Sequence, residues 1–102
     1  MRIVSIAQNA PGPVALARLV AGGATAIKIE PLWGDQIERL SKSWYDELHA
    51  GVTVERLDLK SAEGMTRLHA LLAEADVFLA SQRPSALERL GLDATTLHVT
   101  YP

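Results

Sequence analysis

Lys60, Arg83 and Arg89 are the side chains whose types and positions could do chemistry in this 102-residue chain. Arg83 and Arg89 flank Pro84, soon after the apolar run 77–80. Proline suits the first turn of a helix because it lacks the N–H group that would be unpaired there. A strand followed by a turn and a helix start favours a phosphate site, because the first N–H groups of the helix attract anions. The same pattern also fits an ordinary connection with solvated arginines.

Lys60 occupies a second such place, between a predicted strand at 52–58 and Ser61, a suitable N-cap for the next helix. An ammonium group there can reach a phosphate that backbone N–H groups also hold. Lysines are mostly solvated, however. Position alone therefore leaves a phosphate contact and a solvated side chain both open.

Glu30 suggests another kind of site, because it ends a predicted strand at about the distance from Gly12 at which dinucleotide-binding domains place their ribose-binding acid. The glycine-rich turn of those domains is missing, and prolines stand where a pyrophosphate would need close backbone approach. A surface carboxylate before Pro31 is the preferred interpretation of Glu30.

No metal centre and no nucleophile are predicted. The histidines His49, His69 and His98 lie on different predicted elements without the spacing of metal ligands, so structural or exposed roles are expected. Cysteine is absent, which excludes disulfides and thiolate sites. No serine lies in a Gly-x-Ser-x-Gly turn. We assign no catalytic residue.

The composition indicates one soluble domain with a single core, because 48% of the residues are hydrophobic and 22% are charged. No apolar run is long enough to cross a membrane, and the apolar start of the chain is too short for a signal peptide. A net charge of −2 argues against nucleic acid and membrane partners, although it leaves room for a local basic pocket. The lack of cysteine makes a cytoplasmic location the default expectation.

The elements that must position these residues alternate between strands and helices. Strands are predicted at 2–7, 24–30, 52–58, 77–80 and 98–101. Helices are predicted from Pro13 to the glycine pair 22–23, from Ser61 through Ala75, from Pro84 to Gly91 and, briefly, from Asp93 through Leu97; the segment 32–51 is helical or broken near Ser41. This alternation predicts an α/β, Rossmann-like, doubly wound fold with a mostly parallel sheet of about five strands and helices on both faces.

The carboxyl ends of parallel strands meet at one edge of such a sheet. The predicted turns that leave from these ends follow Ala7, Glu30, Asp58 and Ala80. Lys60 and the turn 81–84 are therefore expected to lie close together at this edge.

Three segments, in the same order and at similar spacing, resemble those of the family III CoA-transferases, which include formyl-CoA and carnitine CoA-transferases and α-methylacyl-CoA racemase. Segment 22–35 (GGATAIKIEPLWGD) resembles the family's LGAEVIKIEPPGGD, and segment 57–64 (LDLKSAEG) resembles LDLKSPEG. Segment 83–92 (RPSALERLGL), with ADV at 75–77 before it, resembles RPGALERLGL. The resemblance covers nearly the whole chain.

The resemblance implies that residues 1–102 form a single Rossmann-like CoA-binding domain, the N-terminal part of a longer family III CoA-transferase. Enzymes of this family transfer CoA between acyl thioesters and carboxylates, so coenzyme A or acyl-CoA is expected as a substrate and no cofactor is expected to be bound permanently. The implied CoA-binding residues are Lys60 and Arg89, at the phosphates, and Leu57, Ala86 and Leu90, around the adenine.

The chain departs from the family's pattern at Pro11, at Leu32, at Val52–Val54 and at Ser81–Gln82. Basic residues are missing at the second and third of these places and an aromatic residue at the fourth, so weak binding of CoA is expected.

The family's nucleophilic aspartate lies beyond the matching segments, and the chain alone is expected to be inactive. The alternatives are a non-catalytic acyl-CoA or nucleotide-binding module, an α-methylacyl-CoA racemase fragment, and a remnant that only associates with another chain. The family's interlocked subunits imply a homodimer, for which Trp33 and Trp44 are candidate contacts.

Overall fold

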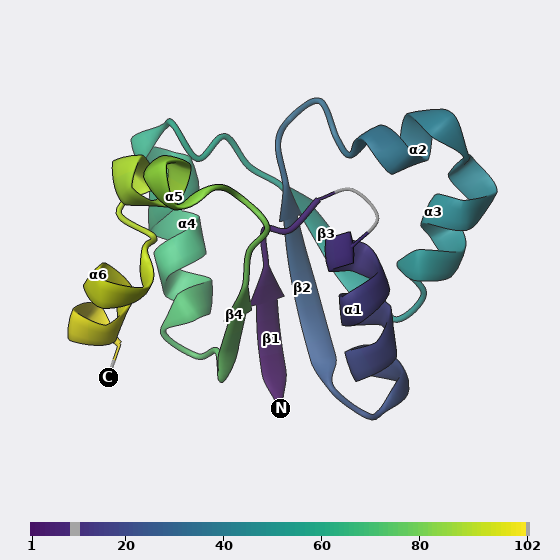
Figure 1. Ribbon diagram of the computed structural model, residues 1–102, viewed down its shortest axis with the longest axis horizontal. Helices are drawn as coiled ribbons and strands as arrows, with labels where there is room; N and C mark the ends of the chain where they lie inside the picture. The colour runs from purple at the N-terminus through teal and green to yellow at the C-terminus, as the bar shows by residue number, and fades with distance from the viewer. Residues whose placement is uncertain (9–10, 102) are drawn as a thin grey trace.

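The structure is a computed structural model that describes residues 1–8 and 11–101. Its centre is a four-stranded sheet with the order β3-β2-β1-β4, in which every neighbouring pair is parallel (Figure 1). The strands are β1 (Arg2–Ser5), β2 (Thr25–Glu30), β3 (Val52–Arg56) and β4 (Val77–Leu79). The predicted parallel α/β sheet is confirmed. Asn9 and Ala10, in the predicted first turn, lie outside the described residues.

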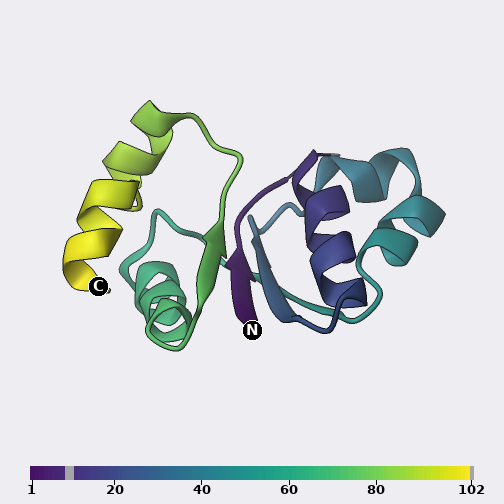
Figure 2. The ribbon, with the colours of Figure 1, turned by 60° about the horizontal axis from the view of Figure 1, so that its bottom comes forward.

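Helices cover both faces of the sheet, as predicted (Figure 2). They are α1 (Pro11–Ala21), α2 (Gln36–Leu40), α3 (Lys42–Leu48), α4 (Ala62–Leu72), α5 (Pro84–Leu90) and α6 (Ala94–Thr100). Helices α1 to α3 lie on one side of the sheet and α4 to α6 on the other. The first helix begins at Pro11 rather than at the predicted Pro13.

Capping residues set most of the helix boundaries. The Ser61 hydroxyl accepts a hydrogen bond from the Gly64 N–H at the start of α4, and Gly91, at φ +71°, ends α5 in the left-handed region. Ser41 ends α2 and also caps α3, where its side chain accepts from the Trp44 N–H. Segment 32–51 therefore contains two short helices, with the break at Ser41.

The predicted fifth strand at 98–101 is wrong, because most of this segment belongs to α6. Asp93 caps α6 by accepting from both the backbone N–H and the hydroxyl of Thr96. Leu97 and Tyr101 then pack against the core next to α4. The β-branched residues of this segment suit a strand, but a strong cap and one apolar face hold it helical.

The core has two layers because β1 alternates its side chains between the two faces of the sheet. On the α4 side, the buried residues are Val4, Ile6, Ile29, Leu68, Leu72 and Leu92. On the α1 side, they are Ile3, Leu16 and Ala26. Both layers leave the carboxyl ends of the strands open at one edge, at the top of Figure 1.

Candidate functional site

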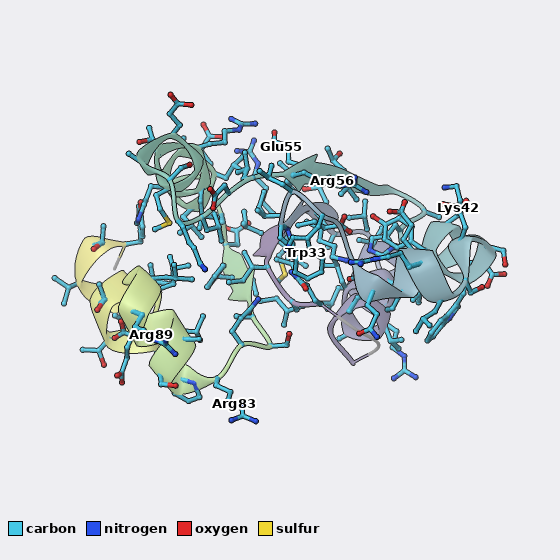
Figure 3. The ribbon with its side chains drawn as sticks, turned by 90° about the horizontal axis from the view of Figure 1, so that it is seen from above. Trp33, Lys42, Glu55, Arg56, Arg83 and Arg89 are labelled. Atoms are coloured by element: carbon cyan, nitrogen blue, oxygen red, sulfur yellow. The ribbon has the colours of Figure 1, made fainter. Side chains whose placement is uncertain are left out.

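A groove of about 590 Å³ opens at this edge, which Figure 3 views from above. Its walls come from the ends of β1 and β2, from the loop after β3 and from α5, and they include Ile6, Ile29, Leu57, Lys60 and Leu90. The loop after β2 adds Pro31, Leu32 and Trp33. The groove is thus mostly apolar, with polar groups at few points, as ligand clefts usually are.

A second hollow of about 520 Å³ adjoins the groove and shares Leu59, Lys60 and Leu90 with it. Met65, Ala86 and Arg89 complete its lining. The five predicted binding residues all line one or both of these hollows: Leu57, Lys60, Ala86, Arg89 and Leu90. Arg83 lines neither hollow, and its side chain points outward from the loop before α5 (Figure 3).

The turn that carries Lys60 is fixed by hydrogen bonds from its neighbours. The Asp58 carboxylate accepts from the Lys60 N–H at 3.0 Å, and the Asp58 carbonyl accepts from the Ser61 hydroxyl at 2.8 Å. A Cβ atom on Gly64 would collide with that carbonyl oxygen, so only glycine lets α4 start this close to the end of β3. The backbone of Lys60 is therefore held, while its side chain is exposed.

The turn between β4 and α5 is fastened to the end of β1. The Gln82 side-chain amide donates to the Ile6 carbonyl at 2.7 Å, and the Gln8 N–H donates to the Ser81 hydroxyl at 3.1 Å. Sequence reasoning treated Ser81 and Gln82 only as missing an aromatic residue. The structure shows that they brace the loop from which α5 begins, and so fix the position of Arg89.

Lys60 and Arg89 place positive charge at this edge of the sheet. Among residues 1–8 and 11–101, no carboxylate forms an ion pair with Lys60 or Arg89. Within the described residues, the Arg89 Nε donates only one long hydrogen bond, to the Ser85 carbonyl at 3.4 Å. A local basic patch therefore exists although the net charge is −2, and it suits a phosphate-bearing ligand.

A buried ionic cluster lies behind the loop after β2, and sequence reasoning missed it. The ammonium of Lys28 lies 2.6 Å from Asp35 Oδ2, 3.0 Å from Glu30 Oε2 and 2.9 Å from His49 Nε2. The Tyr45 hydroxyl also donates to Glu30 Oε2, at 2.6 Å. The side chains of Lys28, Glu30 and Asp35 are each 0% exposed. We call these five residues the Lys28 cluster.

The expected surface position of Glu30 is therefore wrong. Its carboxylate is fully buried, with Lys28 and Tyr45 on Oε2 and the Arg56 Nε 3.6 Å from Oε1. Oε1 accepts no hydrogen bond from the described residues, but full burial of the side chain keeps the carboxylate from the ribose of a dinucleotide. A signal was present in the sequence, because residues 28 and 30 point to the same face of a strand whose faces are both covered.

His49 has a structural role, one of the two roles that the sequence predicts for it. Its Nδ1 lies 2.7 Å from the Tyr45 carbonyl, which can only accept, so Nδ1 carries the proton and Nε2 offers a lone pair to Lys28. Burial, followed by the Lys28 charge, lowers the pKa of His49 below its usual 6.5. Burial and the hydrogen bond to Glu30 raise the pKa of Tyr45. Both side chains are thus neutral.

Metal centres and membrane-spanning helices are both absent from the part of the chain that the structure describes. No three histidine, aspartate or glutamate side chains there are grouped so that they could hold a metal ion. No helix among residues 1–8 and 11–101 has the length and apolar character needed to cross a membrane.

Comparisons with known proteins identify relatives over the whole chain. The model of the family named "CoA-transferase family III" matches residues 1–102. Cinnamoyl-CoA:phenyllactate CoA-transferase of Clostridium sporogenes is 34% identical over 100% of this chain and 27% of its own length. Alpha-methylacyl-CoA racemase of Mus musculus is 33% identical over 95% of this chain and 23% of its own length. The chain spans about a quarter of the length of these curated relatives.

Solved structures agree with the fold. The crystal structure of a CAIB/BAIF family protein from Brucella suis superimposes with a TM-score of 0.89 and 27% identity. The match covers 100% of this chain and 30% of that protein.

The Lys28 cluster predicts a large effect of one isosteric substitution. Asp35→Asn removes a carboxylate from the buried ammonium, yet asparagine caps a helix about as well as aspartate. The change should therefore lower the free energy of unfolding by about 3 kcal/mol, the range for breaking a buried ion pair. Urea denaturation followed by circular dichroism measures this.

The matched control is Asp46→Asn, which removes the carboxylate of the exposed pair between Lys42 and Asp46. This change should cost about 1 kcal/mol or less. Equal losses of stability in the two variants would contradict the structural role given to the Lys28 cluster.

Proposed function

This chain belongs to CoA-transferase family III, and we propose that it forms the N-terminal, coenzyme A-binding portion of an enzyme that transfers CoA between an acyl thioester and a carboxylate. On this proposal residues 1–102 are one Rossmann-like domain, CoA or acyl-CoA is the substrate, and no cofactor is bound permanently. A cytoplasmic location, expected from the cysteine-free composition, is part of the same proposal.

One observation carries this proposal: the residues implied by the family pattern line two adjoining hollows at the carboxyl edge of the sheet. Lys60 and Arg89 line the same hollow, and on the proposal their charged groups meet the phosphates of CoA. Leu57, Ala86 and Leu90 offer apolar contacts to its adenine. Charge-assisted contacts of this kind are about twice as strong as neutral hydrogen bonds.

Binding by this chain alone should be weak. The turn before α5 has Ser81 and Gln82, which brace the loop and offer no ring on which the adenine could stack. The segment Val52–Val54 lacks the basic residues of the family's pattern, and in the structure it begins β3 and lines neither hollow. The phosphates therefore depend mainly on Lys60 and Arg89.

A racemase fragment is the second candidate, and the likeness to alpha-methylacyl-CoA racemase favours it. Both enzymes would bind CoA in the same groove, so this groove does not separate them. A non-catalytic module that binds acyl-CoA or a nucleotide is a further alternative. It predicts that the natural protein binds CoA but catalyses no reaction of it.

We further propose that the 102-residue chain does not turn over thioesters by itself. Each aspartate is engaged structurally. Asp35 binds Lys28, Asp46 pairs with Lys42, Asp58 holds the Lys60 turn, Asp76 accepts from the Arg2 N–H, and Asp93 caps α6. None of them is assigned as the nucleophile, because the family's nucleophilic aspartate lies beyond the matching segments.

The exposed tryptophans support self-association, as expected from the family. Trp33 is 63% and Trp44 is 40% exposed, and Leu32 and Leu40 nearby are exposed as well. Covering such apolar surface with a second copy would gain ~25 cal/mol per Å². Segment 98–101, predicted as a strand, offers no sheet edge to a second copy, because most of it belongs to α6. We propose a two-fold dimer in which Trp33 and Trp44 lie at the contact.

Calorimetry with coenzyme A tests the binding proposal. Removing one charge-assisted phosphate contact should cost about 1.5–3 kcal/mol, so Lys60→Ala and Arg89→Ala should each bind CoA at least tenfold more weakly than the wild type. Arg18→Ala is the matched control, because Arg18 is an exposed arginine on α1, which contributes to neither hollow. Equal affinity in all four proteins would refute the site.

Activity assays test the absence of turnover. The purified chain, incubated with several acyl-CoA donors and carboxylate acceptors, should give no exchange above the level seen with an Arg89→Ala preparation. Exchange that persists after repeated purification and depends on Arg89 would show that the chain is a complete catalyst.

Sedimentation equilibrium over a wide concentration range tests the dimer. The wild type should show a monomer–dimer equilibrium that shifts toward monomer in Trp33→Ala and Trp44→Ala. Val99→Ala is the control, because Val99 is an exposed apolar residue on α6, away from the tryptophans. A wild-type monomer at every concentration would contradict the dimer.

A further inference from the structure

The loop 31–34 forms one wall of the groove, and the residues on either side of it bind the same ammonium group. Glu30 precedes the loop and Asp35 follows it, and both carboxylates bind Lys28 Nζ, at 3.0 and 2.6 Å. Within the loop, the Gly34 N–H donates to the Pro31 carbonyl at 2.9 Å. Arg39 of α2 also holds the loop, because its guanidinium donates to the Trp33 carbonyl at 3.5 Å and lies over the Trp33 ring, 5.1 Å from the ring centroid. The position of this wall therefore depends on Arg39 and on what surrounds Lys28.

His49 is the third group on that ammonium and comes from the C-terminal end of α3. Its ring also stacks on Tyr45, with 3.9 Å between the ring centroids, and Tyr45 donates to Glu30. His49 thus connects α3 to both the ammonium and a carboxylate that flanks the loop. No other described group joins α3 to Lys28 by a hydrogen bond.

Protonation of His49 would disturb this arrangement. Since Nδ1 already donates to the Tyr45 carbonyl, a second proton must go to Nε2, where it would face the ammonium of Lys28 at 2.9 Å. The other charges acting on the ring are the carboxylates of Glu30, from β2, and Asp35, from the N-cap of α2, and they favour protonation. Burial and the nearby ammonium oppose it, and on balance the pKa of His49 is lowered.

We propose that His49 is a positioning residue for the coenzyme A groove, which holds the 31–34 wall through Lys28 while its ring is neutral and loosens that wall when the ring takes a proton. This inference rests on the proposed function, because it takes coenzyme A as the ligand of the groove. It predicts a site whose affinity falls in mildly acidic conditions through a change in the protein itself.

The direction of this pH effect follows from the linkage between proton binding and structure. A base whose pKa is lowered by the native structure binds its proton more weakly there than in a loosened structure, so acidification below about pH 6.5 favours the loosened one. Linkage is reciprocal: if protonation weakens CoA binding, bound CoA must make His49 harder to protonate by the same factor.

Both tryptophans of the chain, Trp33 and Trp44, lie in the segment between β2 and β3, so their fluorescence reports on the wall and on α3. In the wild type without CoA, their emission should change between about pH 8 and pH 5 with a midpoint below 6.5, while far-UV circular dichroism stays unchanged. His49→Gln keeps a hydrogen-bond acceptor for Lys28 but cannot be protonated in this range, so it should abolish the transition.

His98→Gln is the matched control, since His98 is an exposed histidine on α6, and it should keep the transition. A transition that is the same in His49→Gln and the wild type would overturn the proposal, as would the absence of any transition in the wild type. Because this measurement is made without CoA, its result does not depend on whether the proposed function is correct.

Calorimetry with coenzyme A supplies the functional test. The phosphate monoester of CoA itself titrates near pH ~6, so the wild type is compared with His49→Gln at each pH. Between about pH 8 and pH 5.5, the wild type should lose about five-fold more affinity than the variant does, the lower end of usual coupling between sites. Equal losses would contradict the positioning role, whereas no binding at any pH would contradict the proposed function instead.

The wild type also offers a test without any variant. Saturating CoA should move the midpoint of the tryptophan transition to lower pH. If CoA binds but the midpoint does not move, His49 is not coupled to the groove.

Discussion

The ammonium of Lys28 is the group on which the site side of this fold depends. A buried ammonium is tolerated only when charges and hydrogen-bond acceptors surround it, and here they come from β2, from the start of α2 and from the end of α3. Helices α2 and α3 are too short to be stable in isolation. Their attachment to the sheet therefore uses this polar cluster, beside the burial of Ile37 on α2 and Tyr45 on α3.

The second constraint is the parallel arrangement of the strands. Because every strand runs in the same direction, the loops after β1, β2, β3 and β4 all leave at one edge. Short hydrogen bonds then fix these loops to one another, such as the one from Gln82 to the Ile6 carbonyl. The result is a groove whose cations, Lys60 and Arg89, extend from a turn fixed by hydrogen bonds and from a helix whose preceding turn is hydrogen-bonded to the end of β1.

Charge is distributed differently inside the protein and at the groove. Lys28 is surrounded by carboxylates, and Arg56 and Arg67 pair with Glu38 and Glu55 near the rims of the sheet. Lys60 and Arg89 pair with no carboxylate in the part of the chain that the structure describes. A protein with a slightly negative net charge thus presents a locally positive edge. The local charge can attract a phosphate-bearing ligand, while the net charge gives no general attraction for nucleic acid.

The sequence by itself determined the order of the four strands and of the helices α1, α4 and α5, because these follow from local periodicity and turn residues. It also determined the caps at Ser61 and Gly91 and the edge of the sheet at which Lys60 and the turn 81–84 lie, because these follow from local hydrogen bonding and the geometry of parallel strands. Only the tertiary structure decided that 98–101 is mostly helical, since Asp93 and the packing of Leu97 and Tyr101 outweigh strand propensity. It also decided that Glu30 is buried on Lys28. Asp35, His49 and Tyr45 meet that pair across up to 21 residues of sequence, and no local pattern specifies contacts at such separations.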